Sequence, residues 1–183
     1  SALLGRNASG KGTHIDFSMF DGQVSLLTIA AARYFALGEV PVRMGTEHLG
    51  RVPSAAFATA DGGHVQITCN DPHWKPLCKL LDLAEWGADP RVATNAARLE
   101  NRAAVMQTLA AAIARWNRDA FVKAAVAAGV PAGPVLDVRE VIEDPHFRAR
   151  GFPTDVAHPD LGRDVTYPGA PYRFGRTPWR IAR

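Results

Sequence analysis

The most apolar stretch of the sequence, residues 19–37, sets the strongest limit on what the chain can fold into. It is interrupted by polar side chains that would be costly in lipid, namely Asp21, Gln23, Ser25, Thr28 and Arg33. A segment that is apolar yet unsuited to a membrane needs other protein around it. We therefore expect one long helix over residues 19–37, capped by Ser18 and buried in a core.

The elements expected around this helix make a mixed chain of α/β and α+β type. Residues 1–4 resemble the last turn of a helix that Gly5 ends, and the alternation in residues 12–17 predicts a strand. After an irregular stretch, residues 38–53, the expected elements are strands at 56–60 and 64–68, helices at 71–83, 95–116 and 117–129, a strand at 134–136, helices at 138–142 and 144–150, and proline-rich extended segments at 152–183. The expected helix caps are Asp71, Asn95, Asn117 or Asp119, and Asp137, with Gly129 closing a helix.

Composition narrows the class of protein. The chain has 183 residues, 47% of them hydrophobic, which is enough to build a core. The formal net charge of +3 mildly favours anionic ligands, but no basic run is interleaved with aromatic residues, so nucleic acid is not an expected partner. Two cysteines are too few for a disulfide framework and no leader peptide is recognisable, so we expect a cytoplasmic protein without membrane association.

Local motifs offer little catalytic chemistry. Residues 5–11 have the glycine and lysine spacing of a P-loop, but Gly12 stands where a hydroxyl should bind magnesium and a strand is expected next, so a helix-ending turn is favoured. Cys69 with His73 as its base is a possible nucleophile, although simple packing of the thiol is favoured. The histidines and cysteines show no paired ligand spacing, and no serine lies in a Gly-x-Ser-x-Gly motif, so neither a metal nor a serine triad is expected.

The order of several motifs is more informative than any single one. Residues 10–21, GKGTHIDFSMFD, resemble a segment of the class III CoA-transferases, the family that contains the formyl-CoA, carnitine and bile-acid CoA-transferases. Further motifs resemble those of the same family in the same order: residues 57–62, Asn70-Asp71 with Trp74, Asp89-Pro90-Arg91 with Asn95 and Arg98, residues 129–135, Asp144-Pro145, residues 167–171 and Thr177-Pro178. The resemblance covers essentially the whole chain.

The resemblance implies the middle and C-terminal portion of a two-domain enzyme. Residues 1–45 would be the end of a Rossmann-like large domain, residues 46–152 a small α+β domain, and residues 153–183 a segment returning to the large domain. The whole protein would be an interlocked homodimer in which both chains thread through each other.

The resemblance also implies a reaction: coenzyme A passes between an acyl-CoA and a small carboxylic acid through an aspartyl-CoA intermediate, with no metal or redox cofactor. The nucleophilic aspartate is expected upstream, so no catalytic residue is expected in this chain, which alone should be inactive. Three residues are candidates for substrate binding: Met44 and Gly45, at the position of a mobile glycine loop of some members, and Asp71. Asp71 is also the approximate counterpart of a glutamate that pairs with a catalytic histidine in related racemases, although helix capping explains it as well.

Two alternatives stay open at this point. One is proton transfer of the α-methylacyl-CoA racemase type, which needs a paired acid and base. The other is a naturally short, non-catalytic family member that acts as a binding or scaffold module. As a fragment, the chain should instead expose a large apolar surface along residues 19–37.

Overall fold

The computed structural model describes residues 1–180. The chain divides into two compact units, Ser1–Gly45 and Thr46–Arg183. The last three residues of the predicted return segment, 181–183, lie outside the described residues. Within residues 1–180, no helix combines the length and the apolar character needed to cross a membrane.

The first unit contains three short helices, α1 (Ala2–Ser9), α2 (Met19–Ser25) and α3 (Thr28–Leu37). The Ser18 hydroxyl accepts a hydrogen bond from the Asp21 N–H at 3.3 Å, which confirms the predicted cap. Gly38 follows α3 with φ of 69°, a left-handed conformation that ends helices and favours glycine.

Three local predictions for this unit were wrong. Helix α1 continues past Gly5 and ends only at Gly10. Residues 12–17 form no strand, because a strand needs a neighbour for its backbone groups and the described residues supply none there. The long helix is broken at Leu26 and Leu27, whose N–H groups donate to carbonyls only three residues back and so tighten the turn.

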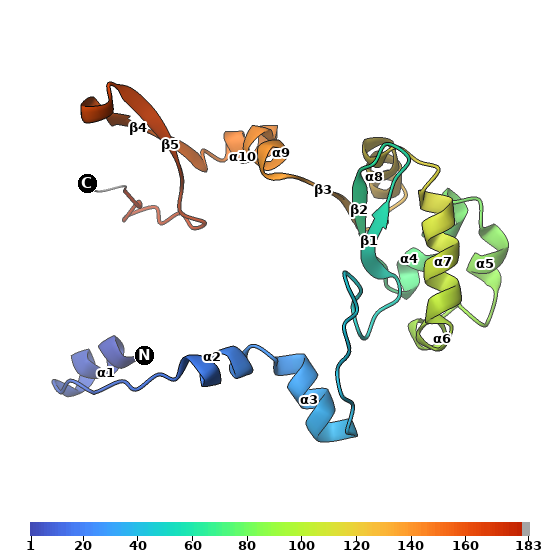
Figure 1. The fold of residues 1–183 in the computed structure, drawn as a ribbon, viewed down its shortest axis with the longest axis horizontal. Coiled ribbons are helices and arrows are strands. Elements are labelled where there is room, and N and C mark those ends of the chain that lie inside the picture. Colours follow the sequence, from blue (N-terminus) through green and yellow to red (C-terminus); the bar gives the residue numbers. More distant parts are fainter. Residues whose placement is uncertain (181–183) are drawn as a thin grey trace. The chain divides into compact units, whose positions relative to one another are not determined.

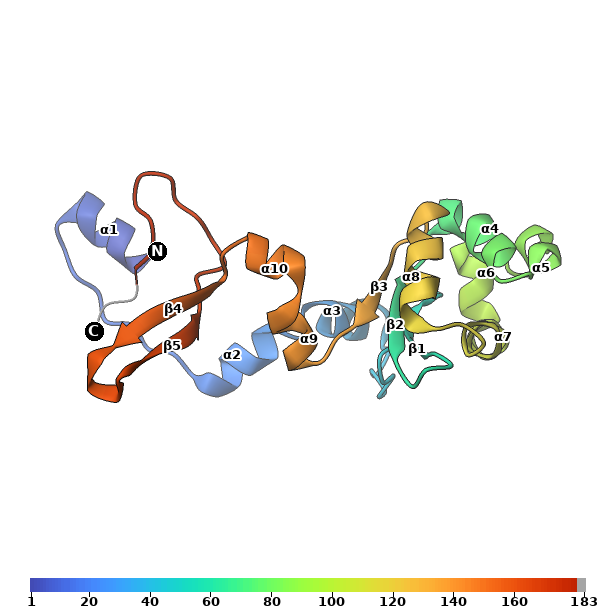
Figure 2. The same ribbon diagram turned by 90° about the horizontal axis from the view of Figure 1, so that it is seen from above.

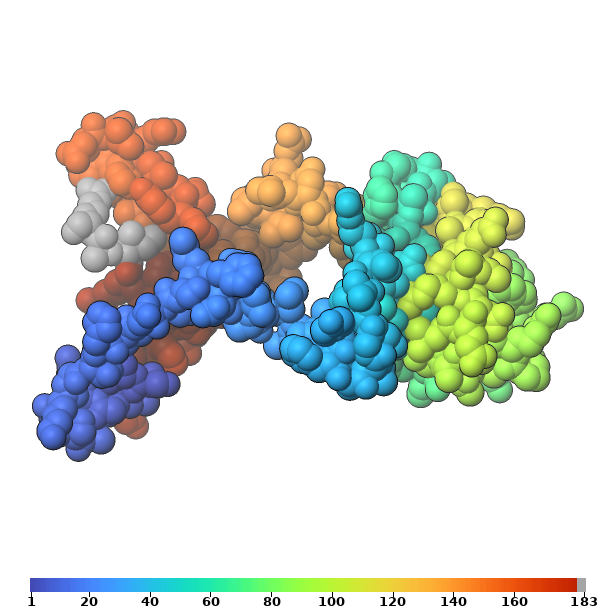
Figure 3. All heavy atoms as spheres, turned by 60° about the horizontal axis from the view of Figure 1, so that its bottom comes forward, coloured from blue at the N-terminus to red at the C-terminus, as the bar shows by residue number. Residues whose placement is uncertain are grey.

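None of residues 1–45 is buried by the described chain. Apolar side chains of this unit are instead largely exposed, such as Phe35 at 83% and Met19 at 81%. In Figure 3 the atoms of this unit, in blue, form a narrow, extended band. The predicted core helix is therefore uncovered within the described chain, and its apolar side chains need cover from other protein.

The second unit is built on a three-stranded antiparallel sheet with the order β1 (Ser54–Ala58), β2 (His64–Thr68), β3 (Ala132–Val135). Phe57 pairs with Val65, and Ile67 pairs with Ala132. The predicted hairpin around Asp61-Gly62 is confirmed, since Gly62 adopts φ of 79° in the connecting turn. This sheet forms one side of the core.

Five helices complete that core: α4 (Asp71–Leu80), α5 (Ala84–Ala88), α6 (Asn95–Glu100), α7 (Arg102–Ile113) and α8 (Arg118–Ala127). Helix α8 packs on β2 and β3, α7 contacts β1, and α4 contacts α5 and α8 (Figures 1 and 2). The predicted helix 95–116 is two helices, because the chain turns at Asn101. The fully buried large side chains include Trp74, Leu77, Leu109, Ile113 and Phe121, each of which stabilises the fold by about 1.5–3 kcal/mol through its burial.

The chain after this core consists of α9 (Val138–Glu143), α10 (Pro145–Ala149) and a hairpin of β4 (Pro153–His158) and β5 (Arg163–Pro168) around the short helix η1 (Pro159–Leu161). The predicted cap Asp137 is confirmed, since it accepts from the Glu140 N–H at 2.8 Å. Asp144, where a helix was expected to start, caps α10 by accepting from the Phe147 N–H at 3.0 Å. No residue of 131–180 is buried. The core of the described chain thus ends at Val130.

Candidate functional site: a loop held by two helices

Three polar side chains on α6 and α7 reach the loop that precedes β1, residues 47–52. They are Asn95 and Arg98, three residues apart on α6, and Arg102, which begins α7 after the chain turns at Asn101. We call these three residues the clamp and residues 47–52 the clamped loop. The other positions of these helices are rich in alanine and aliphatic residues that pack into the core.

Arg102 holds the start of the clamped loop with both ends of its guanidinium. Nη1 donates to Glu47 Oε2 at 2.8 Å, while Nη2 donates to the carbonyls of Leu49 at 2.7 Å and His48 at 3.2 Å. A planar fork with fixed donors suits this combination of a carboxylate and two carbonyls. Arg102 therefore fixes the backbone as well as the charge of the loop.

Asn95 holds the end of the same loop. Its Nδ2 donates to the Gly50 carbonyl at 3.1 Å and its Oδ1 accepts from the Val52 N–H at 3.1 Å. Asn95 was predicted as a helix cap, but the cap is Thr94, whose hydroxyl accepts from the Ala97 N–H. The amide is therefore free to bind the loop.

Arg98 is fully buried and satisfies four polar contacts. Its Nε donates to the Val52 carbonyl at 2.6 Å, and Nη2 donates to Asp71 Oδ1 at 2.7 Å. Nη1 donates to the carbonyls of Val92 and Ala93, each at 3.1 Å. The guanidinium carbon also lies 4.9 Å from the centroid of the Trp74 ring, a cation–π distance.

Asp71 is thus first of all the counter-ion of a buried arginine. The N-cap of α4 is Asn70 rather than Asp71, so the predicted capping role was wrong by one residue. The side chain of Asp71 is 53% exposed, and only its Oδ1 bonds to Arg98. Its structural role is clear, while a substrate contact through the second oxygen remains a prediction.

Met44 and Gly45 directly precede the clamped loop in sequence but belong to the first unit. Met44 is half-buried, and Gly45 is exposed in a turn with φ of 60°, where glycine is favoured. Asp71 belongs to the second unit, so the three predicted substrate-binding residues fall in different units and their role in one site stays a prediction.

The outer side of β1 holds the clamped loop from a second direction. The Thr46 hydroxyl accepts from the Ala56 N–H at 3.1 Å, and the His48 N–H donates to the Ser54 carbonyl at 2.9 Å. The His48 ring then accepts the Gly50 N–H at Nδ1, at 3.1 Å. The loop is therefore fixed by the strand on one side and by the clamp on the other.

The alternative nucleophile, Cys69, is unsuited to catalysis. Burial raises the pKa of the Cys69 thiol to about 12 and that of Cys78 to about 11, so both are neutral thiols at physiological pH. Cys69 Sγ lies 3.4 Å from the Asn70 carbonyl, and His73 Nδ1 accepts from the Asn70 N–H. The preferred interpretation, packing, agrees with this geometry.

The P-loop-like segment does not have the local structure of a phosphate site. Helix α1 occupies most of the P-loop-like residues 5–11, and no helix follows until Met19, so no helix N-terminus faces that turn. Among residues 1–180, no three His, Cys, Asp or Glu side chains cluster in a way that could hold a metal.

A second polar centre, Asp61, fixes the far end of the sheet. Its carboxylate accepts from the Thr59 hydroxyl at 2.6 Å and from the Arg118 N–H at 3.0 Å. These two bonds lower the pKa of Asp61 below its ordinary value. Asn117 is the N-cap residue of α8, one of the two predicted candidates, but its side chain makes no capping bond, and the Asp61 carboxylate from a distant turn accepts the Arg118 N–H instead.

Sequence reasoning did not find the clamp. Asn95 had been noted as a helix cap and, with Arg98, as part of a family motif, and Arg102 had not been noted. Three hydrogen-bonding side chains at helical spacing in an alanine-rich, otherwise apolar segment were the available signal. Their partners lie more than forty positions earlier, beyond any local pattern.

Comparison with known proteins places this architecture in a family. The sequence pattern of CoA-transferase family III matches residues 1–183. A succinate–glutarate CoA-transferase of Agrobacterium fabrum is 32% identical over 183 residues, which are 100% of this chain and 46% of the relative. An acetyl-CoA:oxalate CoA-transferase of Acetobacter aceti is 37% identical over 152 residues, 83% of this chain and 39% of that enzyme.

A solved structure has the same fold as this chain. A CAIB/BAIF family protein from Brucella suis superimposes with a TM-score of 0.74 at 36% identity, covering 96% of this chain and 45% of that one. The chain thus spans about half the length or less of the relatives that it matches. With the match extending over all of its residues, the chain belongs to CoA-transferase family III.

Proposed function

We propose that the protein to which this chain belongs transfers coenzyme A from an acyl-CoA to a small carboxylic acid. The observation that supports this most is the family match over residues 1–183. The relatives described above are named for the exchange of CoA among small carboxylic acids, so dicarboxylates such as glutarate are the first substrates to test.

In the proposed reaction the nucleophile is an aspartate upstream of Ser1. Its carboxylate attacks the thioester carbon and expels the CoA thiolate, which leaves a mixed anhydride. The thiolate then attacks the aspartyl carbonyl, which releases the donor acid and forms an aspartyl-CoA thioester. The acceptor carboxylate runs the same two steps in reverse, takes up the CoA and restores the aspartate. No atom changes oxidation state, so the scheme needs neither a metal nor a redox cofactor.

Within this scheme the chain contributes binding and support. Met44 and Gly45 are proposed to line the substrate site, and Asp71 is proposed to contribute through the oxygen that does not bond to Arg98. We further propose that residues 1–45 complete a Rossmann-like large domain, that residues 153–183 return to it, and that two copies interlock as a cytoplasmic homodimer. The uncovered apolar side chains of α2 and α3 support the need for such a neighbour.

The test uses the whole protein with succinyl-CoA and glutarate. Appearance of glutaryl-CoA, together with hydroxylamine trapping of an acyl group on one aspartate upstream of Ser1, is the expected result. Exchange of a substrate α-proton with solvent deuterium, without a trapped adduct, would instead indicate the racemase alternative. If neither reaction is observed, the scaffold alternative is left, in which the chain folds and pairs without catalysing a reaction.

A further inference from the structure

The Arg102 guanidinium bonds to the clamped loop rather than to its own helix. Its three hydrogen bonds end on Glu47, His48 and Leu49, and the side chain is only 23% exposed. Ordering a long side chain in one geometry is costly, and an exposed ion pair alone rarely compensates for it. The two carbonyl contacts are what distinguish this arginine from an ordinary surface ion pair.

The side chain presented by this loop is His48. Because the Gly50 N–H donates to Nδ1, that nitrogen carries a lone pair and the proton of the neutral ring sits on Nε2. His48 is exposed, and among the described residues none bonds to its Nε2, so this N–H is available to a ligand on a backbone that is held on both sides. An outward N–H donor on a fixed loop suits an anionic oxygen, such as a carboxylate.

We propose that Arg102 is a positioning residue that holds residues 47–49 in one conformation, so that the Nε2–H of His48 binds the carboxylate of the acid that accepts CoA. This inference rests on the proposed function, which supplies the carboxylate. It adds His48 as the residue that recognises the acid and Arg102 as the residue that holds His48 in position.

The proposal has a quantitative consequence. If the loop loses its anchor, only a fraction of molecules presents His48 correctly, and the apparent dissociation constant rises in inverse proportion to that fraction. A tenfold fall in the ordered fraction then raises KM for the acid roughly tenfold and leaves kcat nearly unchanged, because the bound state is the same.

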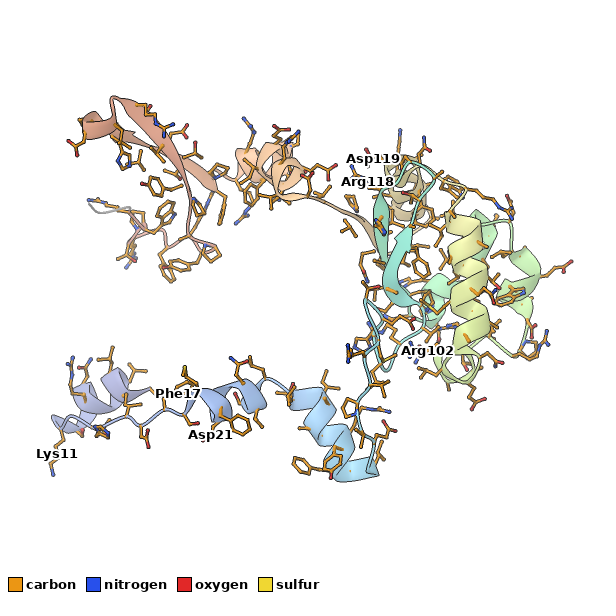
Figure 4. The ribbon with its side chains drawn as sticks, viewed as in Figure 1. Lys11, Phe17, Asp21, Arg102, Arg118 and Asp119 are labelled. Carbon is orange, nitrogen blue, oxygen red and sulfur yellow. The ribbon has the colours of Figure 1, made fainter. Side chains whose placement is uncertain are left out.

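The chain offers a matched control at the other end of the sheet. Arg118 is likewise a partly buried arginine with two carboxylate partners, Asp119 at 2.9 Å and Glu140 at 2.7 Å. Figure 4 shows Arg102 and Arg118 near opposite ends of the sheet. Arg102 has one carboxylate partner, Glu47, and Arg118 has two. Arg118→Lys therefore disturbs at least as many ion pairs as Arg102→Lys without touching the clamped loop.

The experiment compares Arg102→Lys, Arg118→Lys, His48→Leu and His48→Gln in the whole protein. Hydrogen exchange of the amides of residues 48–50 and steady-state kinetics with varied acid are measured together. Arg102→Lys should speed exchange and raise KM for the acid, each about tenfold, with kcat within about twofold. Arg118→Lys should change neither. His48→Leu removes the acceptor of the Gly50 N–H, so only the amide of residue 48, which bonds to the Ser54 carbonyl, reports loop order in this variant. His48→Leu should raise KM without faster exchange of that amide. His48→Gln, which keeps an N–H donor, should restore most of the affinity.

Faster exchange in Arg102→Lys with an unchanged KM would overturn the proposal, since the loop would be ordered by Arg102 but unused. An unchanged KM in His48→Leu would overturn it too. If Arg102→Lys does not fold, Glu47→Gln keeps the carbonyl contacts and should raise KM roughly threefold. A wild-type protein that transfers no CoA refutes the proposed function and the inference with it, whereas failures of the inference alone appear only in an active wild type.

Discussion

Helices α3 and α7 are similar in composition and opposite in surroundings. Both consist largely of alanine and larger apolar residues, yet α7 buries Val105, Leu109 and Ile113 while α3 buries nothing in the described chain. Val105, Leu109 and Ile113 recur at every fourth position along α7 and are buried in the core of the second unit. Helix α3 carries Thr28 and Arg33 among apolar residues that stay exposed. Apolar composition alone therefore does not decide burial, because a helix also needs other elements packed against it, and none buries α3 within the described chain.

The largest expected difference between the two regions is thiol reactivity. Phe35→Cys should react with iodoacetamide at the rate of a free thiol, while Cys69 and Cys78 should react only when their module opens. Opening of a stable core makes that ratio on the order of a thousandfold or more. Peptide mass mapping over time measures it. Comparable rates at the three sites would show that the module around Cys69 does not close.

The next largest effect is expected at the buried arginine. Arg98→Met strands the carbonyls of Val52, Val92 and Ala93 and should lower the free energy of unfolding by about 4 kcal/mol. Urea denaturation measures the loss. Arg91→Met is the control, since Arg91 pairs with Asp89 while its side chain is 82% exposed, and its removal should leave stability unchanged. Equal effects would mean that the clamp is only a surface feature.

A matched pair of truncations sharpens the comparison of the helices directly. Leu109→Ala should destabilise the isolated chain by about 3 kcal/mol, because it leaves a cavity in the core. Phe35→Ala should have almost no effect on the isolated chain, since the ring is 83% exposed. In the whole protein, Phe35→Ala should become costly as well. If it stays neutral there, α3 is not covered by any other part of the assembly.

The smallest expected effect concerns acid. The pKa of Asp61 is lower in the folded protein than in the unfolded chain, first because of the Thr59 hydroxyl and then because of the Arg118 N–H. Its stabilising contribution is therefore present above the unfolded pKa and is lost as the pH falls through the folded pKa. Asp61→Asn should reduce this acid dependence of the urea midpoint, and an identical pH profile in the variant would exclude Asp61 as a cause.

Features with a local cause could be predicted from the sequence. Ser18 and Asp137 cap helices as expected, and Asp144 caps a helix at its expected start, because each bonds to a backbone N–H three residues later. The hairpin around Asp61-Gly62 and the helix end at Gly129 follow from turn chemistry of the same range. These parts of the fold need no knowledge of distant residues.

Features with a distant cause could not be predicted. Asp61 caps a helix that begins at Arg118, and Arg98 joins Val52 to Asp71. Residues 12–17 alternate like a strand but lack a pairing neighbour in the described chain. In each case the deciding partner is remote in sequence, so local propensity either missed the role or assigned it to a neighbour.

The three-stranded sheet has a further consequence for how the chain could aggregate. Its outer strand β1 is occupied by Thr46 and His48, which take up the Ala56 N–H and the Ser54 carbonyl, while β3 carries Pro134, which has no N–H to offer. Neither edge readily accepts another strand. Precipitates of the isolated chain should therefore form through the exposed apolar side chains of the helices in residues 1–45. They should keep a helical circular dichroism spectrum and fail to bind amyloid dyes. Solubility is therefore best engineered on α3 rather than on the sheet.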